Sequence, residues 1–151
     1  MELTLPPFDY RIKKREGVAM IFDVVRRKYV VLTPEEWVRQ HVVHYLYEGK
    51  GCPLSLLAVE REIVLYGLKR RFDLVAFARD GRPWLLVECK APTVTLSQKV
   101  FDQAFGYNLI ISAVHVAVTN GVSHFCGYRN REGRLVLEKD FPSFDTAGTE
   151  T

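Results

Sequence analysis

The stretch Arg71–Lys90, RFDLVAFARDGRPWLLVECK, holds two apolar runs on either side of an Asp-Gly turn. This pattern is typical of a β-hairpin. Because side chains alternate along a strand, we expect Glu88 and Lys90 on one face and Cys89 on the other. Asp73 falls on the partner strand, near the same open end of the hairpin. The sequence therefore predicts two carboxylates and an ammonium group at the end of a mostly apolar sheet.

These three charged side chains suggest a metal site. Burying charges without partners costs several kcal/mol. A divalent cation held by Asp73 and Glu88 would remove that cost, because hard cations prefer carboxylate oxygens. Lys90 would then position or activate a water, or stabilise a phosphoryl oxyanion. The alternative is an ordinary hairpin with a salt bridge at its rim.

Further motifs follow the hairpin in order, and together they resemble a known family. Asp73 followed by Glu88-Cys89-Lys90 resembles the catalytic signature of the PD-(D/E)XK nuclease superfamily. A longer set of motifs is similar to the N-terminal nuclease domain of type I restriction enzyme R subunits. Its pieces are Val59–Glu62, Lys69–Asp73, Leu86–Pro92, Gln103, Tyr107-Asn108 and Thr119–Gly121. The resemblance covers roughly Leu32 to Tyr128.

The resemblance implies a Mg²⁺-dependent DNA endonuclease, with Mn²⁺ as a substitute metal. Asp73 and Glu88 would bind the metal, and the backbone carbonyl of Cys89 would be an extra ligand. A metal-activated water would attack phosphorus, with Lys90 lowering its pKa or stabilising the developing charge. Gln103 would support the site, since a Gln-x-x-x-Tyr spacing follows the Glu-x-Lys strand in RecB-like nucleases.

Further residues have accessory roles in the predicted site. Glu36 or Glu60 would supply a further carboxylate near the metal, but Glu36 also suits a helix N-terminus. Tyr107 shares a helix face with Gln103, which equally fits a buried tyrosine beside an exposed glutamine. A predicted turn before Asp73 carries three basic residues that suit a phosphodiester or an ordinary charged turn: Lys69, Arg70 and Arg71.

The predicted fold is α/β, a restriction-endonuclease-like mixed central β-sheet flanked by helices, with an N-terminal β-ribbon. We expect a single nuclease-like domain over residues 1–151, with an arm and ribbon at 1–32, a core at 33–139 and a frayed tail at 140–151. Helices are expected from Thr33 to about Gly49 and from Ser97 to Ile111. The remaining strands are expected at 56–66, 114–119, 124–128 and 134–138. The helix between the hairpin and 114–119 predicts a parallel crossover.

The composition indicates a globular protein with no extreme charge. Hydrophobic residues make up 48% of the 151 residues, and the net charge is +3. That charge permits nucleic-acid binding without requiring it. The three cysteines have no metal-knuckle spacing, so we expect reduced thiols and a cytoplasmic location. No apolar run is long enough to predict a membrane span.

The expected partners are DNA and, for a restriction complex, separate motor and specificity subunits. The sequence contains no Gly-x-x-x-x-Gly-Lys-Ser/Thr loop, so no ATP site is expected in this chain. Two alternatives stay open. The domain would be a non-catalytic DNA- or protein-binding module on a nuclease scaffold, or a homodimer formed by pairing of the edge strand near Arg134–Glu138.

Overall fold

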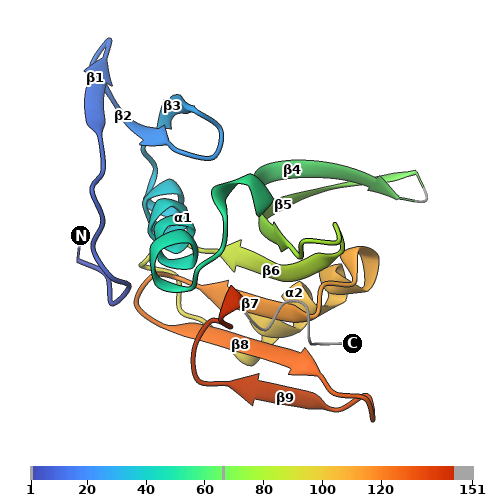
Figure 1. Ribbon diagram of the computed structural model, residues 1–151. Coiled ribbons are helices and arrows are strands. Elements are labelled where there is room, and N and C mark those ends of the chain that lie inside the picture. Colours follow the sequence, from blue (N-terminus) through green and yellow to red (C-terminus); the bar gives the residue numbers. More distant parts are fainter. Residues whose placement is uncertain (1, 66, 145–151) are drawn as a thin grey trace.

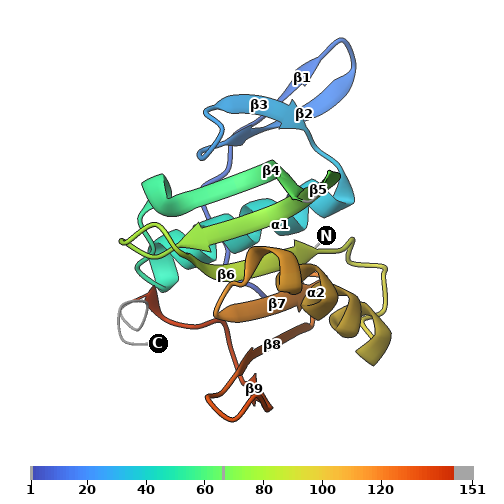
Figure 2. The same ribbon diagram turned by 90° about the vertical axis from the view of Figure 1, so that its right-hand side faces the viewer.

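The computed structural model describes residues 2–65 and 67–144, with their side chains except at positions 63, 65, 107, 109 and 110. Two helices, α1 (Pro34–His44) and α2 (Gln98–Ile111), lie on opposite faces of a six-stranded sheet (Figure 1, Figure 2). A separate three-stranded sheet precedes α1, as the predicted N-terminal ribbon requires. The expected α/β architecture is confirmed.

The strands follow one another across the large sheet in chain order, β4-β5-β6-β7-β8-β9. Only β6 and β7 run parallel among the described pairs, and α2 connects them, which confirms the predicted crossover. The strands of the three-stranded sheet are β1 (Ile12–Arg15), β2 (Val18–Asp23) and β3 (Lys28–Val31). Those of the large sheet are β4 (Leu57–Leu65), β5 (Leu68–Phe77), β6 (Pro83–Cys89), β7 (His115–Thr119), β8 (His124–Arg129) and β9 (Leu135–Glu138).

Both helices have a side-chain cap at the residue where the sequence predicts the helix to start. The Thr33 hydroxyl accepts from the backbone N–H of Glu36 at 3.0 Å, and Pro34 occupies the first turn. Helix α1 continues as a π-helical turn over Tyr45–Gly49. Ser97 caps α2 in the same way. None of the helices in the described ranges has the length and apolarity needed to cross a membrane.

Each helix packs against its own face of the sheet through apolar side chains. On the α1 face, Val38 packs in one cluster with Leu85 and Val87 of β6. On the α2 face, Leu86 packs with Ile111. Alternate residues of β6 thus face opposite helices, which is the period-2 pattern expected of a strand buried on both faces.

The C-terminal segment corrects the prediction of a frayed tail. Phe141 is 2% exposed and Phe144 is 6% exposed, and both belong to the α1-face core. Asp140 accepts a hydrogen bond from the Tyr45 hydroxyl at 2.6 Å and pairs with Lys50 at 3.0 Å. Two apolar anchors and an ion pair therefore hold residues 140–144, while 145–151 lie outside the described residues.

The N-terminal arm is also packed against the core. Leu5 is 4% exposed within the α1-face cluster. The backbone N–H of Thr4 donates to the carbonyl of Gly121 at 3.0 Å, and its hydroxyl donates to the carbonyl of Val122 at 2.7 Å. These contacts join the start of the chain to the turn between β7 and β8.

Candidate functional site

Three carboxylates lie on neighbouring strands of the large sheet: Glu60 on β4, Asp73 on β5 and Glu88 on β6. We call these three side chains the carboxylate row. The pairs on either side of Glu60 in β4 place it opposite Asp73 in β5. The β5–β6 register, continued by one residue, places Glu88 opposite Asp73. The hairpin geometry expected from the sequence therefore brings Asp73 and Glu88 together, and the β4–β5 pairing adds Glu60.

Asp73 is held in place from two directions. Its Oδ2 accepts the backbone N–H of Cys89 at 2.8 Å, and its Oδ1 lies 3.5 Å from Nη2 of Arg39. Burial raises the pKa of Asp73, and the negative charge of Glu88 acts in the same direction. The contacts with the Cys89 N–H and with Arg39 offset part of that rise. The carboxylate is thus ordered, and its charge is only partly compensated.

Glu88 and Lys90 share a face, as predicted. The Lys90 Nζ lies 3.2 Å from Oε1 of Glu88, and both side chains are partly exposed. The other oxygen, Oε2, is buried and has no hydrogen-bond partner among the described atoms. Cys89 points the opposite way, into the α1-face core, where burial raises the pKa of its thiol well above the ordinary value.

Arg39 of α1 was not identified by the sequence analysis, yet it joins the carboxylates. Its Nη1 lies 2.9 Å from Oε1 of Glu60 and 3.3 Å from Oε1 of Glu36. With the contact to Asp73, one guanidinium faces three carboxylates while its side chain is only 6% exposed. The available signal was the i, i+3 spacing of Glu36 and Arg39, which puts both on one helix face.

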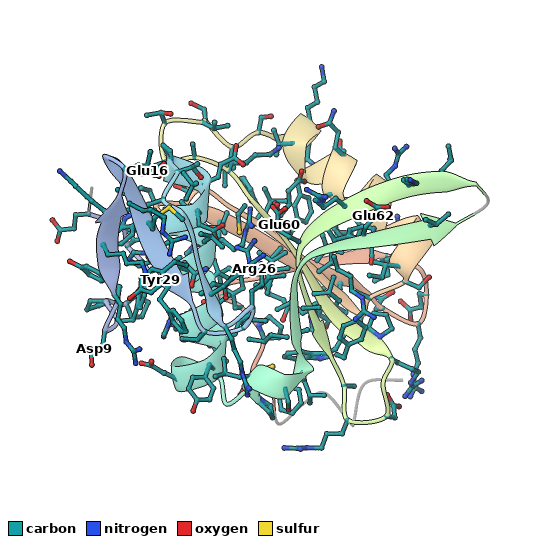
Figure 3. The ribbon with its side chains drawn as sticks, turned by 90° about the horizontal axis from the view of Figure 1, so that it is seen from above. Asp9, Glu16, Arg26, Tyr29, Glu60 and Glu62 are labelled. Carbon is teal, nitrogen blue, oxygen red and sulfur yellow. The ribbon has the colours of Figure 1, made fainter. Side chains whose placement is uncertain are left out.

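Glu36 serves as a connection between elements as well as a helix-start residue. Its carboxylate accepts from Arg26 at 2.7 Å, from Arg39 at 3.3 Å and from Gln40 at 3.1 Å. Arg26 also binds Asp23, at the end of β2. Figure 3 shows Arg26 and Glu60 between the three-stranded sheet and the β4–β5 hairpin. The network therefore links the N-terminal sheet, α1 and the carboxylate row.

The remaining predicted site residues lie farther from these contacts. Gln103 is exposed on α2, and no contact in the described part of the chain joins it to Asp73 or Glu88. Tyr107 also lies on α2, but its side chain is outside the described ones.

The three basic residues before Asp73 lie on β5, which corrects the predicted turn. Leu68 already pairs with Leu65, so β5 starts before the basic residues. Lys69 lies 3.9 Å from Glu62, and Arg71 lies 3.2 Å from Glu60. All three basic side chains, Lys69, Arg70 and Arg71, are exposed.

The oxygen donors suit a hard cation. Within the described residues, no group of three or more His, Cys, Asp or Glu side chains is arranged to hold a metal. Mg²⁺, however, keeps several waters and is commonly bound through one or two carboxylates. Asp73 and Glu88 supply two, and the unpartnered Oε2 of Glu88 is an acceptor that a cation would satisfy. The donor set therefore fits Mg²⁺ or Mn²⁺.

Residues 34–142 match the family described as the type I restriction enzyme R protein N terminus (HSDR_N). The chain belongs to this family. The HSDR_N match confirms the resemblance to R-subunit N-terminal domains and links the chain to restriction-modification. The assignment to the wider PD-(D/E)XK superfamily stays a prediction.

A solved structure supports the HSDR_N fold. It is a fragment of an HsdR subunit of a type I restriction enzyme from Vibrio vulnificus YJ016, with a TM-score of 0.56 and 22% sequence identity. The match covers 78% of this chain and 25% of that chain, so this chain spans about a quarter of the neighbour's length. No curated protein matches the sequence.

Proposed function

We propose that this chain is the nuclease domain of a type I restriction system, a Mg²⁺-dependent endonuclease that hydrolyses DNA phosphodiester bonds. The observation that carries the proposal is the closeness of Asp73 and Glu88 on adjacent strands, where the charge of Glu88 raises the pKa of Asp73, with Lys90 beside Glu88 and one Glu88 oxygen without a hydrogen-bond partner among the described atoms. The Asp…Glu-x-Lys order is that of PD-(D/E)XK nucleases. Membership of the HSDR_N family favours DNA as the substrate.

Each residue of the proposed site has a distinct role. Asp73 and Glu88 would hold Mg²⁺ or Mn²⁺, with the Cys89 carbonyl as an additional ligand. The metal, when bound, would polarise the scissile phosphate and lower the pKa of the attacking water. The Lys90 ammonium would donate to a phosphoryl oxygen and stabilise the charge that develops there. Gln103 would support the site.

Arg39 would act as a positioning residue for the carboxylates. It compensates Glu60 and Asp73 before a cation arrives, and it holds Oδ1 of Asp73 while the Cys89 N–H holds Oδ2. Because cation binding needs an ionised carboxylate, the raised pKa of Asp73 makes metal affinity increase as pH rises through that pKa. Glu36 and Glu60 then serve chiefly to orient Arg39.

In this proposal, translocation and target choice come from outside these 151 residues. The proposed partners are DNA together with the motor and specificity components of a type I system. The sequence holds no nucleotide-binding loop of the Gly-x-x-x-x-Gly-Lys-Ser/Thr type, so ATP use is not assigned to it.

Cleavage of closed circular DNA, single- and double-stranded, tests the proposal. Wild type would be incubated with Mg²⁺ or Mn²⁺ beside Asp73→Ala, Lys90→Ala and the exposed control Arg82→Ala. We expect nicking or linearisation by wild type and the control, and none by the two site variants. Absence of both cleavage and Mn²⁺ binding in wild type would instead support a non-catalytic DNA- or protein-binding module, in which Arg39 permanently neutralises the carboxylates.

A further inference from the structure

The three-stranded N-terminal sheet has one buried face and one open face. On the buried face, Ile21 and Asp23 of β2 are fully inaccessible to solvent. On the other face, Lys13 of β1 lies with its Nζ 4.0 Å from the ring centroid of Tyr29. Phe22 contacts Tyr29 edge-to-face at 5.3 Å between centroids. The open face is thus a layer of aromatic rings with cationic side chains over them.

The exposed charge of this sheet is predominantly positive. Six exposed basic side chains lie between positions 11 and 28: Arg11, Lys13, Lys14, Arg15, Arg27 and Lys28. The exposed acidic side chain in that interval is Glu16, whereas Asp23 is buried and bound to Arg26. The resulting excess of positive charge is larger than the net +3 of the whole chain. A polyanion is therefore the partner that this surface fits.

The sheet is fixed relative to the carboxylate row. Arg26, in the β2–β3 turn, binds Glu36 of α1, and Glu36 contacts Arg39, which reaches Asp73. Figure 3 shows the three-stranded sheet on one side of Arg26 and Glu60, and the β4–β5 hairpin on the other. That hairpin carries the exposed basic residues of β5. Basic side chains therefore lie on both sides of the site, on the β1–β3 sheet and on the β4–β5 hairpin.

We propose that the open face of the β1–β3 sheet, with its basic edge, binds the DNA phosphate backbone and holds the substrate against the carboxylate row. This inference rests on the proposed function for the identity of the polyanion. Lysine and arginine side chains would neutralise phosphates and release condensed counterions. Phe22 and Tyr29 support two of these cations, because Arg11 lies over the Phe22 ring at 5.3 Å and Lys13 over the Tyr29 ring at 4.0 Å. The β4–β5 hairpin would contact the same DNA on the other side of the site.

Fluorescence anisotropy of a labelled duplex, measured in EDTA over a range of salt concentrations, tests this inference without cleavage. The ribbon variant carries Lys13→Gln, Lys14→Gln and Arg15→Gln. Its matched control carries Arg131→Gln, Arg134→Gln and Lys139→Gln, which removes the same charge from exposed positions near β9. Each lost phosphate contact lowers the slope of log affinity against log salt by about 0.9. We expect the ribbon variant to lose roughly two to three units of slope and at least about tenfold in affinity.

The outcomes separate this inference from the proposed function. Equal losses in the ribbon variant and the control, or no DNA binding by wild type, would overturn the role of the ribbon. Asp73→Ala should bind DNA like wild type in EDTA while cleaving nothing in Mn²⁺. Cleavage by wild type with an unaffected ribbon variant would leave the nuclease proposal standing alone. DNA binding that the ribbon variant loses, without any cleavage by wild type, would support the role of the β1–β3 sheet and contradict the nuclease proposal.

Discussion

Replacing Arg39 by methionine should destabilise the domain in the absence of metal. The guanidinium lies 2.9 Å from Glu60, 3.3 Å from Glu36 and 3.5 Å from Asp73, and the side chain is 6% exposed. Removing one partner of a buried ion pair costs about 3–5 kcal/mol, because the remaining charge stays uncompensated. Glu36 keeps Arg26. We therefore expect the lower end, about 3 kcal/mol, or roughly 6–12 °C in melting temperature for a domain of this size.

Urea and thermal denaturation, followed by circular dichroism in EDTA, would measure this effect. Arg82→Met is the matched control, since Arg82 pairs with Asp80 while its side chain is 68% exposed, and such pairs contribute about 0–1 kcal/mol. Adding Asp73→Asn to Arg39→Met should recover part of the loss by removing an uncompensated charge. A melting temperature for Arg39→Met within about 2 °C of wild type would refute the idea that Arg39 neutralises the site.

Three further predictions address the rest of the structure. Burial raises the pKa of Cys52 to about 11 and that of Cys126 to about 12, and it raises the pKa of Cys89 well above its ordinary value. Ellman's reagent at neutral pH should therefore react with none of the three thiols in native protein. In urea it should react with all three. Because the pKa of Asp73 is raised on folding, folded protein binds that proton more tightly than the unfolded chain, so the free energy of unfolding should fall as pH rises through the raised pKa. Asp73→Asn should flatten this decline in metal-free urea titrations, and an unchanged pH dependence would show that Asp73 does not cause it. Phe141→Ala should cost about 3 kcal/mol in the same assay, because the ring is 2% exposed, whereas a frayed tail would give no change.

The hairpin and the parallel crossover could be predicted because their signals are local. Alternation along β6 already puts Glu88 and Lys90 on one side and Cys89 on the other, and the structure agrees. The helix-start signal at Thr33 and Pro34 likewise lies within the first turn of the helix that it begins. Period-2 patterns and caps depend on neighbouring residues alone.

The site network depends on contacts that no local pattern contains. Arg39 meets Glu60 and Asp73 only because α1 packs against the face of the sheet formed by β4, β5 and β6, so its burial is a tertiary effect. Phe141 and Phe144 show no periodicity, yet they fill the α1-face core. The side chain of Gln103, in contrast, was assigned from a motif, and its exposed position on α2 leaves that assignment as a prediction.

Calorimetric titration of Mn²⁺ into metal-free protein tests the central claim most directly. Wild type would be compared with Asp73→Asn and Glu88→Gln, and with Asp80→Asn as a control, because the Asp80 side chain is 50% exposed at the hairpin turn. The account predicts a cation site in wild type and the control that is lost in both site variants, with affinity that increases as pH rises through the raised pKa of Asp73. Absence of binding in wild type, or equal binding in all four proteins, would contradict a metal site at Asp73 and Glu88.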